Sequence, residues 1–352
     1  MKPSLRHPVL EEDLHQIFLG SLPWERLTGK TILVTGATGL VASYLVETLL
    51  YRNEVIAGPA CTVVALVRDK DRASRRFAHH SARPDLQFLI QDATVPLPSA
   101  LQSNFIIHAA GNSSPGLFGR DPVGTYKPAI LGTHYLLEHA HTVDCEGFLL
   151  LSSGAVHGSM VGENTAMNER VIGIVDPLEP YACYAESKRM AETMCTSWSR
   201  QFGVPTRMAR LGHTYGPGLR RDDNRAFAEF VYAILDQRDV ILQSDGSAVR
   251  PYCYLSDAAE ALIRILLLGG DGEAYLVANV EATCTVLELA TILVNLFPDR
   301  TGRVKMAASV QLGSISDRYS KCRLDVTKLH DLGWWPQVDI QHGFSRTLRS
   351  LL

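Results

Sequence analysis

Residues 31–42 read Thr31-Ile-Leu-Val-Thr-Gly-Ala-Thr-Gly-Leu-Val-Ala42, an apolar run followed at once by two glycines. The run predicts a buried strand and the residues after it predict a helix, so the glycines fall at the turn between the two. Gly36 permits a tight turn, and Gly39 lets the backbone approach a pyrophosphate at the helix N-terminus. We therefore predict a dinucleotide-binding turn, with contacts from Gly36, Thr38, Gly39, Leu40 and Val41.

The pattern on either side of this turn indicates the fold class. From residue 30 onward, short apolar runs alternate with amphipathic stretches, which is typical of a parallel sheet covered by helices on both faces. Strands are expected at residues 31–34, 62–67, 86–90, 105–109, 147–151 and 206–211, and helices at 41–52, 71–79, 124–141 and 184–202. The predicted fold is α/β, a Rossmann-type doubly wound parallel sheet.

The alternation of apolar runs and amphipathic stretches ends at Gly216-Pro-Gly218, which is followed by a charged patch and a predicted helix at 227–235. We expect residues 216–352 to form mainly a smaller α/β substrate-binding lobe. It would be interleaved with a dinucleotide-binding domain of residues 29–215, because no linker separates the two. Residues 1–28 are expected to be an N-terminal extension with a helix near 10–19 packed on the body.

The ends of the second and third strands should contact the adenosine half of a dinucleotide. The second strand ends in Arg68-Asp69, where an acid favours NAD and an arginine can hold the 2′-phosphate of NADP. This pair leaves the choice open, and Asp69 is equally well explained as a solvated loop residue. Asp92, after the third strand, is a candidate acceptor for the adenine amine or a simple cap.

Three further side chains predict hydride chemistry. Ser153 follows the strand at 147–151, at the sheet edge where open α/β sheets place their sites. Tyr184 and Lys188 lie four residues apart on a helix, where an ammonium can stabilise a phenolate whose reference pKa is about 10. Tyr184 is thus a candidate base for a sugar or alcohol hydroxyl, and Ser153 a candidate catalytic hydroxyl.

Composition narrows the functional classes. With 46% hydrophobic and 20% charged residues over 352 residues, the composition predicts a soluble globular protein. The net charge of −3 does not favour a basic surface that would bind nucleic acid or an anionic membrane. No apolar run is long enough to span a bilayer. The seven cysteines lack paired short spacing, which favours reduced thiols and a cytoplasmic location over disulfides or a metal site.

Taken together, these segments resemble the extended short-chain dehydrogenase/reductase family, in particular its NAD-dependent nucleotide-sugar epimerases, dehydratases and decarboxylases. The resemblance covers about residues 30–340. It rests on the turn at 35–42, His108-Ala-Ala-Gly111, Gly132-Thr133, the run 152–158, Tyr184-Ala-Glu-Ser-Lys188, Tyr215-Gly-Pro217, the run 250–257 and Leu332-Gly-Trp334. The helix at 182–195 is most similar to the UDP-glucuronate decarboxylases.

The resemblance implies roles for individual residues. Tyr184 would be the base, Lys188 would lower its pKa and hold the nicotinamide ribose, and Ser153 would donate to the reacting oxygen. Further cofactor contacts are implied for Arg68, Asp92, Ala93, Ala109, Ala110 and Gly111, and substrate contacts for Asn112, Ser113, Ser153, His213, Arg225 and Arg250. The implied cofactor is NAD, with NADP not excluded, and the implied substrate is a nucleotide sugar. A homodimer is also implied.

Departures from the family pattern separate the possible reactions. A 4,6-dehydratase needs an acid and a base at the positions of Gly154 and Ala155, neither of which transfers protons, and the resembling decarboxylases carry a glutamate in place of Ala155. A 4-epimerase needs only the serine, tyrosine and lysine. We therefore expect a nucleotide-sugar 4-epimerase, followed by a UDP-glucuronate-type decarboxylase, a 4-ketosugar reductase and a 4,6-dehydratase. A non-catalytic member of the fold is a further alternative.

Four positions remain open. His157 and His213 replace residues that are usual in relatives, and each is either a donor to the substrate or a structural imidazole. Arg220 and Arg221 belong to a charge run that either contacts the nucleotide or forms a solvated loop.

Overall fold

The computed structural model describes residues 6–159, 166–179, 181–300, 302–307 and 323–352. The α-helices are α1 (Pro8–Phe18), α2 (Leu40–Val55), α3 (Lys70–Arg76), α4 (Pro115–Phe118), α5 (Pro122–Lys127), α6 (Thr133–Thr142), α7 (Ala182–Phe202), α8 (Ala226–Leu235), α9 (Leu255–Leu268), α10 (Val286–Leu296), α11 (Thr327–Asp331) and α12 (Ile340–Arg349). Short 3-10 helices are η1 (Trp24–Leu27), η2 (Ala78–His80), η4 (Gly154–His157), η5 (Val280–Ala282) and η6 (Pro298–Arg300), and η3 (Pro128–Gly132) is a π-helix. Within these residues, no helix is both long and apolar enough to span a bilayer.

The strands form one large sheet and two small ones. They are β1 (Thr31–Thr35), β2 (Thr62–Val67), β3 (Leu86–Ile90), β4 (Phe105–His108), β5 (Gly147–Ser153), β6 (Thr206–Leu211), β7 (His213–Tyr215), β8 (Val240–Leu242), β9 (Val249–Tyr254), β10 (Glu273–Val277), β11 (Thr283–Thr285) and β12 (Val304–Met306). In the described part of the chain the large sheet has seven parallel strands in the order β10-β6-β5-β4-β1-β2-β3. The predicted Rossmann-type fold is confirmed.

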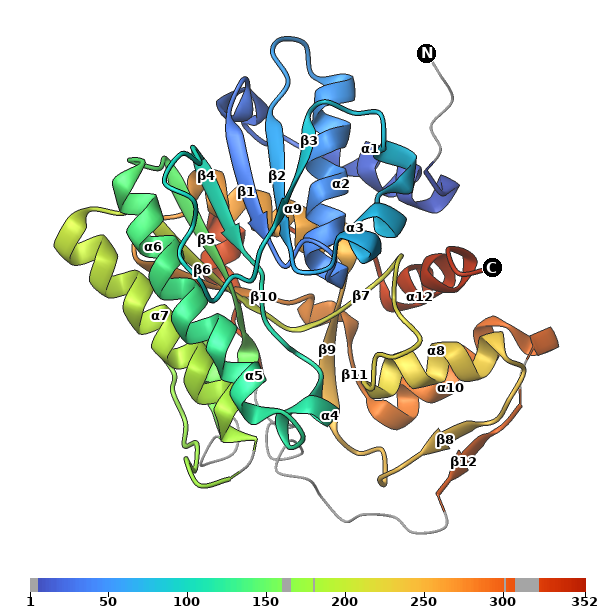
Figure 1. The fold of residues 1–352 in the computed structure, drawn as a ribbon. Helices are drawn as coiled ribbons and strands as arrows, with labels where there is room; N and C mark the ends of the chain where they lie inside the picture. Colours follow the sequence, from blue (N-terminus) through green and yellow to red (C-terminus); the bar gives the residue numbers. More distant parts are fainter. Residues whose placement is uncertain (1–5, 160–165, 180, 301, 308–322) are drawn as a thin grey trace.

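Helices cover both faces of the large sheet, as Figure 1 shows. Alternate residues of β1 point into different layers, because successive side chains of a strand face opposite ways. Ile32 and Val34 pack with α1, α2 and α9, whereas Leu33 packs with α6 and α7. The strand order reverses at β1, which has β2 on one side and β4 on the other. Ligands of open α/β sheets bind at such a switch point, beyond the carboxyl ends of the strands.

All six predicted strands are present, with ends shifted by at most two residues, and the structure adds β10 at the edge of the sheet. The single helix predicted at 124–141 is instead a helical run of α5, η3 and α6. The π-helix begins at Pro128, whose nitrogen has no hydrogen to donate. It ends at Gly132, where an added Cβ would lie 3.3 Å from both the Ala93 oxygen and His108 Cε1. The irregular turn therefore brings this segment close to the end of β4.

The C-terminal third supplies the two small sheets, β11-β9-β7 and β12-β8, which Figure 1 shows beside α8 and α10. Their core is aromatic: Tyr215 stacks on Phe344 with ring centroids 3.9 Å apart, and Phe227 and Tyr252 pack edge-on around them. This third also contributes α9, which packs on the large sheet, and β10, which is its edge strand. The division into residues 29–215 and 216–352 remains a prediction.

The N-terminal extension joins the two ends of the chain. The helix expected near residues 10–19 is α1, and it packs against α2 and α9. Asp13 accepts hydrogen bonds from the Tyr254 hydroxyl and from Arg346 Nε, both at 2.7 Å. Burial raises the pKa of Asp13 to about 6, although Tyr254 and Arg346 oppose the shift. Helix α1 thus anchors α12 and the end of β9.

Candidate active site

The glycine-rich turn has the geometry that a bound pyrophosphate requires. Gly36 has a φ of 63°, and a Cβ there would lie 2.8 Å from Ala110 Cα, so only glycine fits. Gly39 is the N-cap of α2 and supplies no side-chain cap, which leaves the first amides of the helix facing the turn. Thr38, Leu40 and Val41 lie in this turn or at the start of α2. The segment fits a dinucleotide phosphate.

A hydrogen-bonded bridge connects this turn to the end of β4. His108 Nε2 lies 3.2 Å from the Pro128 oxygen, and Nδ1 lies 2.8 Å from Thr35 Oγ1. Burial and the charge of Lys188 lower the pKa of His108 to about 3, so the ring is neutral. A carbonyl only accepts, so Nε2 carries the proton and the Thr35 hydroxyl donates to Nδ1. The Thr35 oxygen in turn accepts the amides of Ala109 and Ala110, at 3.2 and 3.0 Å.

Residues 109–113 therefore follow β4 directly beside the cofactor turn. Ala109 and Ala110 touch Gly36, and a Cβ at Gly111 would lie 3.7 Å from Lys188 Nζ. Asn112 Oδ1 accepts the amide of Ser114 at 3.2 Å, whereas Ser113 is exposed. The predicted cofactor contacts at 109–111 lie between the glycine turn and Lys188.

The ends of β2 and β3 carry the predicted adenosine contacts. Arg68 is largely exposed, and its Nη1 lies 3.7 Å from Asp92 Oδ2. Asp92 Oδ1 accepts two hydrogen bonds from Thr94, which lower its pKa against the opposing effect of burial. Ala93 is buried beside them. Asp69 Oδ1 accepts the amide of Arg72 at 2.9 Å and thereby caps α3, a role that the sequence analysis did not consider for it.

The three predicted catalytic side chains come from β5 and α7. Ser153 ends β5, and its hydroxyl accepts the amide of Ala155 at 3.1 Å. Lys188 is buried, and its Nζ donates to the Leu151 oxygen at 2.7 Å. Burial lowers the pKa of Lys188 to about 8, although the charge of Glu192 opposes the shift. The ammonium is thus held at the carboxyl end of the central strand.

Tyr184 differs from the expectation in one respect. Burial raises the pKa of its phenol, while a side-chain hydrogen bond with Ser153 and the charge of Arg225 oppose the shift. The sequence predicted that Lys188 lowers this pKa. Here the groups that lower it are Ser153 and Arg225, while the Lys188 ammonium donates to the Leu151 oxygen. The Tyr184 ring stacks on Phe118 at 4.6 Å, so α4 fixes its orientation.

The 3-10 helix after Ser153 carries no group that transfers protons beside the serine. Gly154 and Ala155 form its first half. His157 is buried with Nδ1 2.7 Å from the Val171 oxygen, and burial lowers its pKa. Its Nε2 is buried without a hydrogen-bond partner among the described residues. The burial of His157 and its bond to the Val171 oxygen fit the structural alternative.

The predicted substrate residues His213, Arg225 and Arg250 lie within electrostatic range of one another. Burial, together with Arg250 and Arg225, lowers the pKa of His213 to about 3, so its imidazole is neutral at physiological pH. Arg225 donates to the Asp223 carboxylate, with Nε 2.9 Å from Oδ1, and its Nη1 donates to the Thr214 oxygen at 3.3 Å. Since the charge of Arg225 also acts on Tyr184, it electrostatically connects the lobe to the catalytic group.

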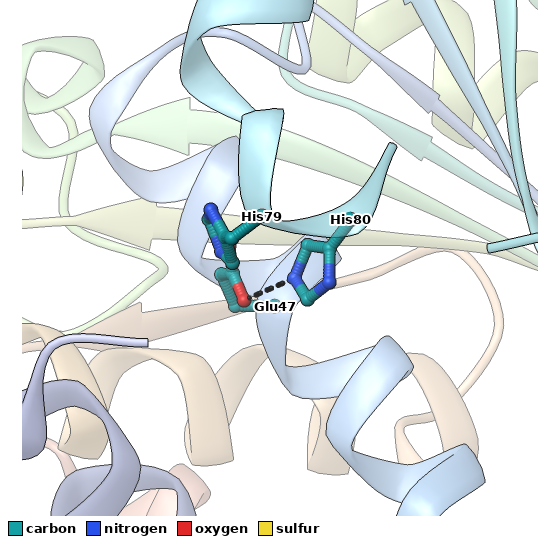
Figure 2. A group of neighbouring side chains, drawn as sticks. All are labelled: Glu47, His79 and His80. Carbon is teal, nitrogen blue, oxygen red and sulfur yellow. Dashed lines mark hydrogen bonds and ion pairs between the residues drawn. The ribbon is translucent and has the colours of Figure 1, made fainter. Parts of the chain in front are cut away.

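Three side chains of the types that bind metal ions lie together between α2 and η2. Figure 2 shows Glu47 of α2 between His79 and His80, which follow α3. The two Nε2 atoms lie 2.8 and 2.7 Å from separate carboxylate oxygens, and Arg6 Nε donates to Glu47 Oε2 at 2.9 Å. Burial opposes ionisation, but the hydrogen bonds from both histidines lower the pKa of Glu47. A metal ion would compete with Arg6 for this oxygen, so we interpret the group as an ion cluster.

Comparison with known proteins identifies the family. Residues 32–292 match the model of the NAD dependent epimerase/dehydratase family. The chain belongs to the NAD-dependent epimerase/dehydratase family. It is 32% identical over 317 residues to UDP-glucuronic acid decarboxylase 6 of Arabidopsis thaliana, covering 89% of this chain and 86% of the relative. It is 30% identical to UDP-glucuronic acid decarboxylase 1 of Danio rerio, covering 91% and 72%.

Solved structures show the same epimerase/dehydratase fold. UDP-glucose 4-epimerase of Thermotoga maritima with UDP-glucose matches with a TM-score of 0.77 and 23% identity, over 91% of this chain and 98% of that one. UDP-glucuronic acid 4-epimerase of Bacillus cereus, in complex with UDP-glucuronic acid and NAD, matches with a TM-score of 0.74 and 22% identity over the same shares. The prediction of NAD is confirmed at the level of the family.

Sequence reasoning missed Thr35, His108 and Phe118, which position the turn, the end of β4 and the Tyr184 ring. His108 stood inside a quoted motif, but its role requires knowing that β1 and β4 are neighbours. Phe118 lies 66 residues before Tyr184, and no spacing rule connects them.

Proposed function

We propose that this chain is a nucleotide-sugar 4-epimerase that uses NAD. The observation that supports this most directly is the combination of a buried Lys188 and half-buried Ser153 and Tyr184 with Gly154 and Ala155 beside the serine. These three side chains can oxidise and re-reduce one carbon. Among the described residues, the two positions that follow Ser153 carry no acid or base for a further step. Such a site suits an inversion at C4.

Ser153 and Tyr184 would have separate roles in the oxidation and re-reduction of C4. When bound, NAD supplies the hydride acceptor and later the hydride donor. Tyr184 takes the proton of the C4 hydroxyl as the C–H bond breaks and the C=O bond forms, and Ser153 donates a hydrogen bond to that oxygen. After the 4-keto sugar turns its other face, Tyr184 returns the proton as the new C–H bond forms.

The nucleotide would be held while the sugar turns. Arg225 and Arg250 are the candidate diphosphate ligands, because a guanidinium binds phosphate oxygens in a bidentate manner. His213 would act between them as a neutral donor or acceptor, since burial and both arginines lower its pKa.

A second candidate is decarboxylation of a UDP-glucuronate-type substrate. The relatives that are 30 to 32% identical favour it, because they are named as UDP-glucuronic acid decarboxylases. A 4-ketone makes the uronate a β-keto acid that loses carbon dioxide readily, so an acid at position 155 assists this step without being indispensable. A 4-ketosugar reductase and a 4,6-dehydratase rank below these two.

Product analysis separates these reactions. The chain is incubated with UDP-glucuronate, UDP-glucose and their GDP, CDP and dTDP counterparts, and the products are analysed by mass spectrometry and NMR. An unchanged mass with inverted C4 supports the proposal. A product lighter by carbon dioxide supports the decarboxylase, loss of water the dehydratase, and stoichiometric consumption of reduced cofactor the reductase. Tyr184→Phe is the control for background reaction.

A further inference from the structure

A buried ion pair joins the helix that carries Tyr184 and Lys188 to the large sheet. Glu192 of α7 and Arg210 of β6 are both buried, and Arg210 Nη2 lies 2.7 Å from Glu192 Oε2. Arg210 Nε lies 3.0 Å from Oε1 of the same carboxylate, so the guanidinium binds it in a bidentate manner. Helix α7 packs on β5 and β6, which Figure 1 shows beside it.

Neighbouring groups hold the Glu192 carboxylate in one position. Ser152 Oγ donates to Glu192 Oε1 at 2.5 Å, and Ser152 is the residue of β5 that pairs with Arg210 of β6. The remaining nitrogen of the guanidinium, Arg210 Nη1, donates to the Glu169 oxygen at 2.7 Å. Each nitrogen of Arg210 that can donate therefore has an acceptor. Neither charged group can turn away without losing hydrogen bonds that are buried from water.

This carboxylate lies one helical turn after Lys188. Residues four apart share a face of a helix, and both side chains are buried. Lys188 donates to the Leu151 oxygen, and Glu192 accepts from Ser152, the next residue of β5. The ammonium and the carboxylate thus meet the same strand at consecutive positions. Opposite charges at such a place interact strongly, because little water screens them.

The groups around Lys188 show where its negative counter-charge comes from. Burial lowers the pKa of Lys188 to about 8, and the charge of Glu192 opposes this shift, followed by Cys195. Burial raises the pKa of the Cys195 thiol far above its usual range, so the thiol is uncharged at neutral pH. His108 of β4 is neutral, because burial and the charge of Lys188 lower its pKa to about 3. Among the described residues that interact electrostatically with Lys188, Glu192 therefore supplies the negative charge.

Two further titratable groups on elements packed against α7 act on this region through Glu192. Arg210 of β6 is bound to the carboxylate itself. His157 of η4 interacts with both members of the pair, and burial lowers its pKa, so its imidazole is neutral at physiological pH. Neither group offers Lys188 a negative charge.

We propose that Glu192 is a positioning residue for Lys188: its carboxylate, fixed by Ser152 and Arg210, keeps the buried ammonium protonated at the carboxyl end of β5. The inference deepens the proposed active site and rests on Lys188 acting there, where it would hold the nicotinamide ribose. Glu192 would act on the reaction only through the charge of Lys188.

Nuclear magnetic resonance measures this charge directly. Lysine enriched in ¹³C at Cε is incorporated into the full chain, and the signal of Lys188 is assigned from its absence in Lys188→Met. The wild type should titrate near pH 8. In Glu192→Gln, which keeps the shape and removes the charge, the midpoint should fall by about one pH unit or more. Glu186→Gln, the same change at a half-exposed position of α7, is the matched control and should leave it within about 0.3 pH unit.

The test does not depend on one variant. Glu192→Gln leaves Arg210 buried without its carboxylate, which lowers stability, so urea unfolding is measured alongside. The double variant Glu192→Gln/Arg210→Gln removes both charges, and Lys188 should still titrate below the wild type, since Glu192 rather than Arg210 is among the groups that act on it. An unchanged midpoint in either folded variant would overturn the proposal. A wild-type midpoint below about pH 7 would overturn it without any variant.

Cofactor binding connects this charge to the site. In Glu192→Gln, calorimetric titration should show NAD binding about threefold more weakly at pH 7.5 than at pH 6, because a neutral amine forms a weaker hydrogen bond than an ammonium. The wild type should stay within about 1.5-fold over this interval. A lowered Lys188 midpoint with unchanged NAD affinity would support the inference on Glu192 and contradict the ribose contact of Lys188. Neither measurement uses a sugar, so the epimerase proposal is tested separately.

Discussion

Lys188 introduces a positive charge into a buried site, and this costs stability. Its pKa in the folded chain is about 8, against 10.5 in the unfolded chain. Below pH 8 both states carry the proton and the full penalty is present. Between pH 8 and 10.5 the unfolded state binds more protons, so stability rises with pH. Chemistry, rather than folding, explains the residue.

We therefore expect Lys188→Met to stabilise the chain at pH 7 by roughly 1–3 kcal/mol while lowering activity strongly. The gain should shrink as pH rises from 8 to 10.5, where the wild-type lysine loses its charge. Urea unfolding at pH 7 and pH 9.5 measures both values. Lys70→Met, an exposed substitution on α3, should be near neutral. A less stable Lys188→Met variant at pH 7 would contradict this account.

The raised pKa of Tyr184 predicts the pH profile of catalysis. In the proposed mechanism the phenolate is the base, and the raised pKa keeps the phenol predominant at neutral pH, so kcat/KM should rise by up to about tenfold per pH unit between pH 6 and 9. Tyr184→Phe should lower it by about 10²- to 10⁴-fold and remove the slope. Tyr181→Phe removes an exposed phenol at the start of the same helix and should preserve both. A flat wild-type profile would exclude Tyr184 as the titrating base.

At the residue scale, sequence motifs suffice for groups that lie close along the chain. Tyr184 and Lys188 share a helix, and Ser153 follows a recognisable strand. They do not suffice for the Thr35 and His108 bridge, which exists only because β1 pairs with β4. The effect of burial on Tyr184 likewise depends on Phe118 from a distant helix.

Among the elements, the turn between β1 and α2 is the least tolerant of change. Gly36 and Gly203 both have positive φ values, 63° and 71°, yet a Cβ at Gly36 would strike the backbone of Ala109 and Ala110, and one at Gly203 would meet nothing within 4 Å. Replacing each glycine by alanine therefore separates the free-energy cost of a positive φ from the cost of a steric contact.

Gly203→Ala should cost about 1–2 kcal/mol of stability and leave cofactor affinity unchanged. Gly36→Ala should cost more and weaken NAD binding, because β1 and the end of β4 must separate. Urea unfolding and calorimetric titration with NAD give both quantities for each variant. Equal effects of the two substitutions on NAD affinity would show that the contact with residues 109 and 110 does not shape the site.

Helices and strands were predicted correctly where one regular spacing of apolar residues extends over the whole segment. The strands at residues 62–67, 86–90 and 206–211 were predicted to the residue. The π-helix at 128–132 was missed. Pro128 could have indicated an irregular turn, since it has no N–H to donate, but the packing of Gly132 against His108 depends on a contact distant in sequence. Strand β10 is short, and no local sequence pattern indicates that it pairs with β6 of the large sheet rather than with a strand of the two small sheets.

At the scale of the whole molecule, the predicted homodimer has a candidate surface. Leu136 and Leu137 of α6 are buried in the chain's own core and do not contribute to it. Leu131 of η3 and Met190 of α7 are exposed, and they lie on neighbouring elements. Exposed apolar side chains of this kind are commonly covered by a partner.

We expect the chain to sediment as a dimer and the double variant Leu131→Arg/Met190→Arg to sediment as a monomer. Two introduced charges per subunit would be buried without partners in the dimer, which is strongly unfavourable. Leu268→Arg, at an exposed apolar position at the end of α9, is the control and should remain dimeric. A double variant that is still a dimer would move the interface elsewhere.

The pairing of α1 with α12 has a consequence for shortened variants. Arg346 donates to Asp13, to Glu12 Oε2 at 3.0 Å and to the Val9 oxygen at 3.0 Å, so the guanidinium fastens α12 to α1. A variant cut before α12 would keep the buried carboxylate of Asp13 without its arginine partner. We therefore expect the removal of α12 to loosen α1, although the two helices are more than 300 residues apart along the sequence.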